Sequence, residues 1–437
     1  MSTLEQGASV TGTRPGACPV AHDFDPFDGT PQSFFTRARR ETPVFWHDDI
    51  RAYVLTRYED CRRLLGDRSG DVSANAALLF HLNVEPMPEA MRILQESDFD
   101  IAPSVVDEDG EAHKLHRGAA QTPFTFNRVR HLREFTREQV TKRLDAIITD
   151  GAADIVDAMI YEVPATVILH MMGVPVDEMG DLKRFRGPWG IFIWGNPDEQ
   201  VQLDTARQMA DFGRWARAIA DDRLAHPGDD MISETIANLR AKGVLDSDRA
   251  WLNSYTLNIV MAGHETTANT AAEGLVALLR HRDQWQAIVD DPSLIPNAAE
   301  EILRFATGVP TWRQRAVTEL RFGDVTVPAG SVVYAALTSA NRDEDVFGPD
   351  SESFDVRRES ARKHIAFGTG PHTCMGNHLA KLEICVMLEE LTRRLPHLEL
   401  VADQHIEYSP NTSQRGPEHV HVRWDPARNP VEADRVR

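Results

Sequence analysis

The sequence predicts a mainly α-helical protein with small β-sheets, built as one large domain. Apolar residues recur with a helical period from about residue 113 to residue 306. Strand-like alternation is confined to three short regions, 44–54, 313–333 and 397–424. No internal repeat or long linker interrupts the 437 residues, so one domain is expected rather than several.

The elements follow in order from these patterns. A helix over 34–41 precedes a two-stranded hairpin over 44–54, and a second helix covers 58–65, whereas 68–110 has no clear period. The main helical region is predicted to contain helices over 113–121, 128–150, 153–172, 177–186, 199–225, 229–242, 247–280, 283–290 and 296–306. Strands with Gly and Pro turns follow, then an irregular stretch over 341–372 and a last helix over 374–395. An irregular stretch of that length inside a compact domain usually has a function.

The charge balance excludes several classes of partner. The chain has 47 basic and 67 acidic side chains, a formal net charge of −20, and such a surface repels nucleic-acid phosphates and anionic lipids. No apolar stretch is long enough for a signal peptide or a membrane span. The widely spaced Cys18, Cys61, Cys374 and Cys385 support neither a disulfide framework nor a zinc ribbon. We expect a cytoplasmic protein with no nucleic-acid and no membrane partner.

The strongest chemical signal is the stretch 367–376, which reads Phe-Gly-Thr-Gly-Pro-His-Thr-Cys-Met-Gly. Two glycines bracket one residue and permit a tight loop whose backbone amides can turn toward a single sulfur. Cys374 lies at the predicted start of the last helix, where the helix dipole favours a thiolate. A thiolate among N–H groups suits a metal-bound sulfur; a buried cysteine that only caps a helix is the plain alternative.

This stretch closely resembles the heme-binding loop of the cytochromes P450, F-G-x-G-x-H-x-C-x-G. A chance match to its six defined residues is on the order of 10⁻⁸ per starting position. Met375 stands where Leu is common, which is a conservative change. The resemblance implies that Cys374 is the proximal thiolate and metal ligand, that Phe367 packs on the sulfur side of the heme, and that His372 reaches a heme propionate.

A second motif lies midway along the long predicted helix, where 262–267 read Ala-Gly-His-Glu-Thr-Thr. Gly263 would let a flat ligand approach, and the weak helix formers suggest a local bulge. An acid followed by a hydroxyl can move protons from solvent to a bound oxygen. A polar patch on an exposed face is the alternative. Beside the cysteine loop, the motif resembles the oxygen-activation stretch of the same family, which implies that Thr266 holds the bound oxygen and Glu265 supplies protons. His264 is given no role.

Further charged residues match family motifs. Glu301 and Arg304 form an E-x-x-R on one helix face, where they can pair. In the family this pair is structural and locks the loop before the cysteine, and Arg357 matches its third member. These three residues are therefore expected to be structural and not catalytic.

His113 and Arg117 match the family's H-x-x-x-R helix, which contacts the heme propionates. The two propionate carboxylates need cationic donors, and these side chains can supply them. A solvated basic helix face is the alternative. The resemblance implies one more propionate arginine on the strand after the E-x-x-R helix. Arg315 is preferred to Arg313 because Ala-Val-Thr-Glu follows it in a family-like way.

The resemblance covers about residues 23–424, between a loose tail over 1–22 and a C-terminal tail over 425–437. It implies the triangular, single-domain P450 fold, heme b, and reductive activation of O₂ that inserts oxygen into a C–H bond of a small molecule. Since no flavin or iron–sulfur segment is recognisable, electrons are expected from an external ferredoxin and ferredoxin reductase. The basic face of this chain on which the ferredoxin would dock is expected to contain Lys114, His116, Arg358, Arg362 and Lys363.

Two other functions remain open. One is a heme protein that binds ligands without turnover, against which the intact Glu265–Thr266 pair argues. The other is a P450-fold enzyme that couples radicals into C–C or C–N bonds, or uses peroxide. The pocket is expected from parts of 75–105, 180–200, 255–266, 306–312 and 408–413. Its aromatic residues, Phe185, Trp189, Phe192 and Trp194, either pack the core or hold an aromatic substrate. Family habit suggests a hydrophobic substrate from secondary metabolism.

Overall fold

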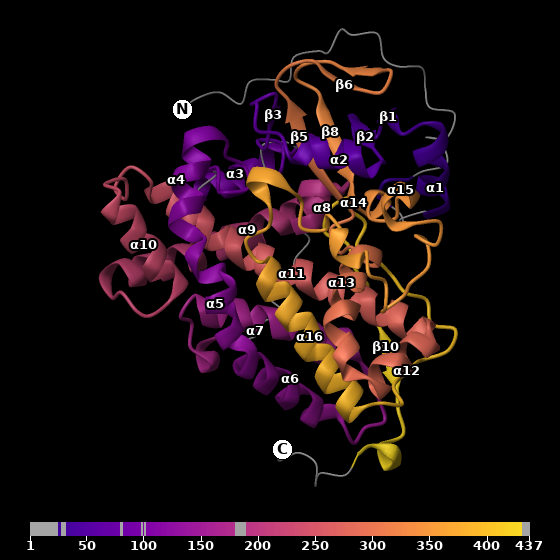
Figure 1. Cartoon of the computed structure of the whole chain (residues 1–437). Coiled ribbons are helices and arrows are strands. Elements are labelled where there is room, and N and C mark those ends of the chain that lie inside the picture. The colour runs from indigo at the N-terminus through magenta and orange to yellow at the C-terminus, as the bar shows by residue number, and fades with distance from the viewer. Residues whose placement is uncertain are drawn as a thin grey trace.

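The computed structural model describes residues 25–27, 32–78, 82–97, 99, 102–179 and 189–430. Helices fill the centre and base of the molecule, and the largest sheet lies at the top of the view (Figure 1). The α-helices are α1 Gln32–Glu41, α2 Tyr58–Leu65, α3 Pro88–Glu96, α4 Gly110–Ala120, α5 Phe126–Val129, α6 Arg133–Ile147, α7 Glu162–Met171, α8 Trp189–Trp194, α9 Glu199–Ala225, α10 Met231–Ala241, α11 Arg249–Arg280, α12 Arg282–Asp290, α13 Ile295–Phe305, α14 Leu337–Ala340, α15 Glu344–Phe347 and α16 Asn377–Arg394.

Short strands form three small sheets in this part of the chain. The strands are β1 Val44–His47, β2 Ala52–Leu55, β3 Val72–Ser73, β4 Ala152–Asp154, β5 Thr311–Ala316, β6 Leu320–Phe322, β7 Val325–Val327, β8 Val332–Ala336, β9 Glu399–Leu400 and β10 His421–Arg423. Their orders are β1-β2-β8-β5-β3, β4-β10-β9 and β6-β7, and only β2 and β8 pair in parallel among these ladders. The β6–β7 turn has Gly323 at φ +56°, as a type II′ hairpin requires at its first central position.

Helix α11 is the central element of the fold. It packs against α7, α9, α13 and α16, and most of its residues are buried, as expected for a helix that is apolar on nearly all sides. A Cβ on Gly263 would lie 2.8 Å from Cγ1 of Ile168 on α7. Gly263 therefore makes room for a neighbouring helix and not for a flat ligand. The expected bulge is absent, since α11 is a continuous α-helix.

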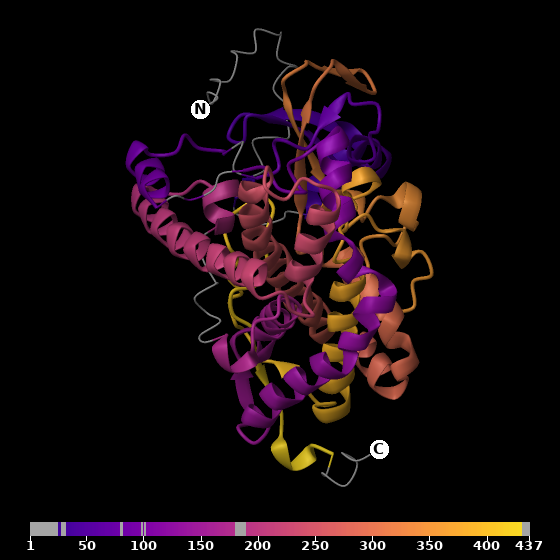
Figure 2. The same ribbon diagram turned by 90° about the vertical axis from the view of Figure 1, so that its left-hand side faces the viewer.

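Helix α9 is the long rose-coloured helix on the left of Figure 2, and α3 packs against it. Its bounds, like those of α2, are the ones that the sequence predicts. The single helix expected over 153–172 is not observed. Strand β4 and a π-helical segment, Val156–Ile160, occupy the first half of this range, and α7 occupies the second half. The reason is long-range, because β4 pairs with β10 from the C-terminal part of the chain.

Some expected features lie outside the described residues. They include Cys18 and the whole tail over 1–22, Phe185, and most of the helix expected over 177–186. A 3₁₀ turn, Val176–Glu178, stands at the start of that helix. Among the described helices, none combines the length and the apolar composition that a membrane crossing requires.

Candidate active site

The loop before α16 folds tightly around Cys374. The backbone N–H of Cys374 donates to the carbonyl oxygen of Phe367 at 2.9 Å. Gly368 and Gly370 have φ values of +66° and +74°, which glycine adopts without strain. A Cβ on Gly370 would lie 2.7 Å from Cα of Gly66 at the end of α2, so the loop can lie against α2 only with glycine there.

The Cys374 side chain is exposed although protein surrounds it. Burial raises the pKa of its thiol, while the backbone N–H of Gly376 and the positive charge of Arg117 act in the opposite direction. An accessible sulfur that is also shielded from bulk water faces an internal space. No group of three or more His, Cys, Asp or Glu suited to a metal occurs in the described chain. A single accessible thiolate at a helix start fits a metal whose other ligands belong to a cofactor.

His113, His372 and Arg117 come together beside this loop. The two imidazole rings lie 4.1 Å apart between centroids, and Nη2 of Arg117 donates to the carbonyl oxygen of Thr373 at 2.6 Å. His113 is buried, and its Nε2 has no hydrogen-bond partner in the described structure. Burial, followed by the charges of His372 and Arg117, lowers the pKa of His113 to about 4. An unpaired buried nitrogen beside cationic groups fits an anionic, carboxylate-bearing ligand.

Arg313 and Arg315 lie on one face of β5 but differ in what they contact. Arg313 is fully buried. Its guanidinium donates to Ala76 O, Leu78 O, Ile193 O, Asn83 Oδ1 and Tyr334 Oη. Half-buried Arg315 donates only to Asn75 Oδ1 at 3.0 Å and Gly330 O at 3.2 Å among the described residues. Arg315 therefore retains donors for a ligand, whereas the contacts of Arg313 are structural.

Asp109 links Arg315 to the histidine pair. Ser73 lies opposite Arg315 in the β3–β5 ladder. Asp109 accepts a hydrogen bond from Oγ of Ser73 at 2.5 Å, and its Oδ1 lies 3.6 Å from Nε2 of His372. Burial alone would raise the pKa of Asp109, but hydrogen bonds from His372, Ser73 and Ala74 lower it. Sequence reasoning missed this carboxylate, which precedes α4 in an ordinary acidic run.

One face of α11 is accessible, although most of the helix is buried. Asn258, Ala262 and Thr266 share this face at intervals of four residues. Ala262 is exposed and the other two are half-buried, although most of α11 is buried. Oγ1 of Thr266 donates to the carbonyl oxygen of Ala262 at 2.7 Å. A small residue and a hydroxyl therefore stand where a ligand can reach them.

Tyr161 connects Glu265 to the neighbouring helix. Its hydroxyl donates to Oε1 of Glu265 at 3.5 Å, and its carbonyl oxygen accepts from Nε2 of His264 at 3.0 Å. His264 is buried, so its role is to fix α11 against the segment before α7. Sequence reasoning missed Tyr161 because the two residues in contact are 104 positions apart and no local motif marks it.

Comparison with known proteins shows the family to which this chain belongs. A family model described as Cytochrome P450 matches residues 293–414. A steroid C26-monooxygenase of Mycobacterium tuberculosis is 34% identical over 304 residues, which are 70% of this chain and 81% of that protein. This chain belongs to the cytochrome P450 family.

Solved P450 structures agree with the fold. The P450 heme domain of Tepidiphilus thermophilus matches with a TM-score of 0.89 and 34% identity, over 94% of this chain and 99% of that one. An intact type IV self-sufficient P450 monooxygenase matches with a TM-score of 0.91 and 39% identity, over 96% of this chain but 55% of that one. The predicted single-domain, mainly helical P450 fold is confirmed. The family implies heme b as cofactor and an oxygenase enzyme.

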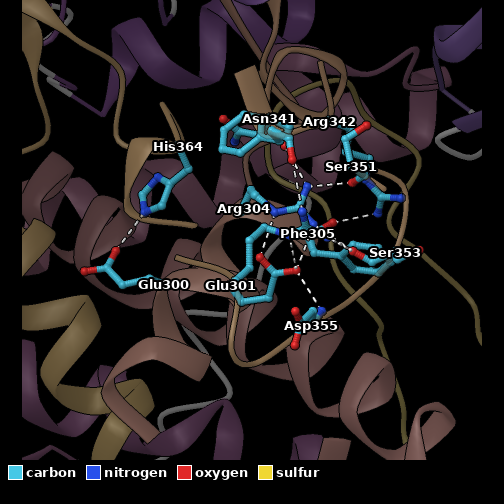
Figure 3. A network of polar contacts seen from close by, with 12 residues as sticks. Glu300, Glu301, Arg304, Phe305, Asn341, Arg342, Ser351, Ser353, Asp355 and His364 are labelled. Carbon is cyan, nitrogen blue, oxygen red and sulfur yellow. Dashed lines mark hydrogen bonds and ion pairs between the residues drawn. The ribbon is translucent and has the colours of Figure 1, made fainter. Parts of the chain in front are cut away.

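The E-x-x-R pair of this P450, Glu301 and Arg304, lies in a network of polar contacts (Figure 3). Nε of Arg304 lies 2.7 Å from Oε2 of Glu301, and neither side chain is accessible. The third member is Arg358, whose Nε lies 3.4 Å from Oε1 of Glu301, and the prediction of Arg357 is wrong. Arg357 is exposed because the turn after Asp355 directs residue 358 inward and residue 357 outward.

This buried trio (Glu301, Arg304 and Arg358) fixes the chain leading to the cysteine loop. Nη1 of Arg304 donates to the carbonyl oxygens of Asn341 and Ser351. The side-chain oxygen of Asn341 accepts the backbone N–H of Ile365 at 2.8 Å, two residues before the loop motif.

A second ionic network lies beside the trio and was not expected. Glu300 contacts Nε2 of His364 at 3.1 Å and Nζ of Lys381 at 2.9 Å (Figure 3 shows the first). Burial would raise the pKa of Glu300, but hydrogen bonds from His364 and Lys381 lower it to about 2. Lys381 also lies over the ring of Phe367, 5.6 Å from its centroid. The network therefore joins α13 and α16 to the loop.

Two of the predicted docking residues do not reach the surface. Arg358 belongs to the buried trio. His116 is buried between Glu108, 2.8 Å from its Nδ1, and Asp248, 3.1 Å from its Nε2. The prediction of a docking role for both is wrong, because each side chain is buried and paired with acids: Arg358 with Glu301, and His116 with half-buried Glu108 and Asp248. Of the five docking residues, those that the structure leaves exposed are Lys114, Arg362 and Lys363.

The aromatic residues of the expected substrate region pack the core. Trp189, Phe192 and Trp194 are each at most 2% exposed, and Trp194 donates through Nε1 to the carbonyl oxygen of Ala77 at 3.0 Å. Side chains that bordered an internal space would show accessible surface, as Ala262 does. These three rings therefore support core packing rather than an aromatic clasp.

Proposed function

We propose that this P450 oxidises a hydrophobic small molecule bound against the Asn258–Ala262–Thr266 face of α11, with heme b ligated by Cys374. The observation that carries the proposal is the accessible surface of Cys374 and Ala262 inside a helical core. When bound, the heme supplies O₂ activation with two electrons from outside the site. A steroid C26-monooxygenase among the relatives supports a large apolar substrate. An aromatic substrate, secondary metabolism and a cytoplasmic location stay predictions.

The residues around the cysteine loop would hold the cofactor. The thiolate of Cys374 would ligate the metal, and Phe367 would pack beside it. The cationic or N–H-bearing side chains proposed for the propionates are His113, Arg117, Arg315 and His372. Arg315 is chosen over Arg313 because Arg313 already donates to five oxygens.

The residues of α11 would handle protons. Glu265 contacts the hydroxyl of Tyr161, from which its carboxylate can receive a proton. Thr266 donates its own proton to the carbonyl oxygen of Ala262, which leaves the lone pairs of Oγ1 to accept one. Thr266 therefore orients proton donors toward the site, and Glu265 supplies protons to those donors.

Thr266→Ala is expected to preserve heme and substrate binding but to divert reducing equivalents into H₂O₂. We expect product formed per electron consumed to fall at least about tenfold, because a positioned proton donor is lost. Thr256→Ala is the matched control, since buried Thr256 makes the same bond, to the carbonyl oxygen of Leu252, elsewhere on α11. Equal coupling in wild type and Thr266→Ala would contradict the role of Thr266.

The substrate class can be tested by spectral titration of the heme with a compound panel. Steroids, fatty acids and fused-ring aromatics are expected to shift the heme absorption at low concentration, and charged metabolites of similar size are not. A panel in which only charged compounds bind would contradict a hydrophobic pocket.

We further propose that electrons come from an external ferredoxin and its reductase, drawn by exposed Lys114, Arg362 and Lys363. Turnover supported by ferredoxin should fall as ionic strength rises, because salt screens exposed charges beyond about 8 Å at physiological strength. Arg362→Glu with Lys363→Glu should slow turnover further and leave substrate binding unchanged. Reversal of Arg207 and Arg214, exposed on α9, is the control. Turnover indifferent to salt and to the double reversal would contradict docking at these charges.

A further inference from the structure

Asn258 interrupts the buried surface of α11, the helix at the centre of the molecule (Figure 1). Every other residue over 251–261 is buried, whereas Asn258 is half-buried. Asn is also a weak helix former, because its side chain competes for backbone hydrogen bonds. An amide that keeps accessible surface in the middle of such a helix is a candidate for contact with a ligand.

Neighbouring hydrogen bonds fix the orientation of the Asn258 amide. Its Nδ2 donates to the carbonyl oxygen of Ser254 at 2.9 Å and to Oγ of Ser254 at 3.2 Å. Oγ of Ser254 donates its own proton to the carbonyl oxygen of Ala102 at 2.8 Å, so it can only accept from Asn258. The amino group of the amide therefore faces Ser254. Oδ1 of Asn258 is turned away from Ser254 and has no hydrogen-bond partner in the described structure.

The place of Asn258 on α11 indicates which group this acceptor suits. Asn258 shares a face with Ala262 and Thr266, and the eight residues from Asn258 to Thr266 span about 12 Å of helix. Residues 250–263 include no charged side chain. A charged group bound beside Asn258 would therefore find no counter-charge on this part of α11. The acceptor suits a neutral donor instead.

We propose that Asn258 selects elongated apolar substrates that carry a hydroxyl group about 12 Å from the carbon that is oxidised. This inference rests on the proposed function, in which the substrate lies along this face of α11, and it places the reacting carbon near Thr266. The substrate hydroxyl donates to Oδ1 of Asn258, which neither an ether nor a carboxylate can do. Analogues without the donor leave Oδ1 unpaired, so the contact gives both orientation and specificity.

The first test measures affinity by spectral titration of the heme-loaded protein with dodecanol, its methyl ether and dodecanoate. Wild type is expected to bind dodecanol about 3- to 10-fold more tightly than the methyl ether, the contribution of one neutral hydrogen bond. Asn258→Leu should abolish this preference, because it removes the acceptor at similar volume. Asn253→Leu, the same change at a buried position five residues earlier, should keep the preference. Equal CO-bound spectra after reduction would show that all variants fold and hold heme.

The second test measures which carbon is oxidised in linear alcohols of increasing length, from decanol to hexadecanol. In wild type, the number of bonds between the hydroxyl group and the oxidised carbon should stay constant as the chain lengthens, because Asn258 fixes the hydroxyl end. In Asn258→Leu the oxidised position should spread over several carbons. A residue with a merely structural role would not change the position of oxidation in this way.

Equal affinity of wild type for dodecanol and its methyl ether would overturn the inference, and so would a preference that survives in Asn258→Leu. Tighter binding of dodecanoate than of dodecanol would also overturn it, by assigning the position to an anion. A site of oxidation that keeps a constant distance from the methyl end in wild type would do the same. Failure of the proposed function looks different: no apolar compound, with or without a hydroxyl, would then shift the heme absorption of the wild type.

Discussion

Cys374→His is expected to abolish the red-shifted CO band that reduced, thiolate-ligated heme gives. The reason is electronic, since a neutral imidazole donates less charge to the iron than a thiolate does. Oxygenase turnover should be lost with the band, while the fold is retained because the loop is fixed by backbone bonds such as Cys374 N–H to Phe367 O. The measurement is the absorption spectrum of the reduced, CO-bound protein.

Cys385→Ser provides the control for this experiment. Cys385 is half-buried on α16, the helix that follows the loop, and packs against the apolar core. Its replacement should leave the band unchanged. A Cys374→Ser protein with an unaltered band would show that another residue ligates the iron.

Glu301→Gln is expected to lower the free energy of unfolding by about 3–5 kcal/mol. Glu301 is fully buried and meets both Arg304 and Arg358, so its neutralisation leaves Arg304 in the interior without a counter-charge and leaves Arg358 with exposed Asp350 alone. Denaturant unfolding of the heme-loaded protein, followed by heme absorption and far-UV circular dichroism, gives the difference.

Two neighbouring arginines sharpen this experiment. Arg358→Ala should also destabilise, because Glu301 loses one of its two cationic partners and a cavity replaces the buried Arg358 side chain. Arg357→Ala should change stability by no more than about 0.5 kcal/mol, since Arg357 is exposed. If Arg357→Ala were the more destabilising of the two, the trio would be assigned wrongly.

Features encoded by adjacent residues could be predicted from the sequence. The cysteine loop is one continuous stretch with fixed spacing, so its position before a helix follows from the residues themselves. Helices with a strong period, such as α9 and α11, also appear where the pattern places them. Local chemistry alone determines these features.

Features that depend on a choice between neighbours, or on distant contacts, could not be predicted. Arg357 and Arg358 are equivalent in sequence, and only the turn after Asp355 decides which of them enters the core. The sequence around His116 is typical of an exposed cation, but the fold places Glu108 and Asp248 on either side of its ring. Strand β4 exists because residues near 421 pair with it, a contact that no local pattern records.

The parallel pairing of β2 with β8 has a consequence for how the chain is made. Tyr53 pairs with Val333, so the largest sheet joins segments about 280 residues apart. At roughly 5–20 residues per second of synthesis, the β1–β2 hairpin leaves the ribosome roughly 15–60 s before its partner strand exists. Until then its apolar edge is open to other chains. The N-terminal hairpin is therefore the segment of this P450 that depends most on protection during translation, although the heme site lies in other elements.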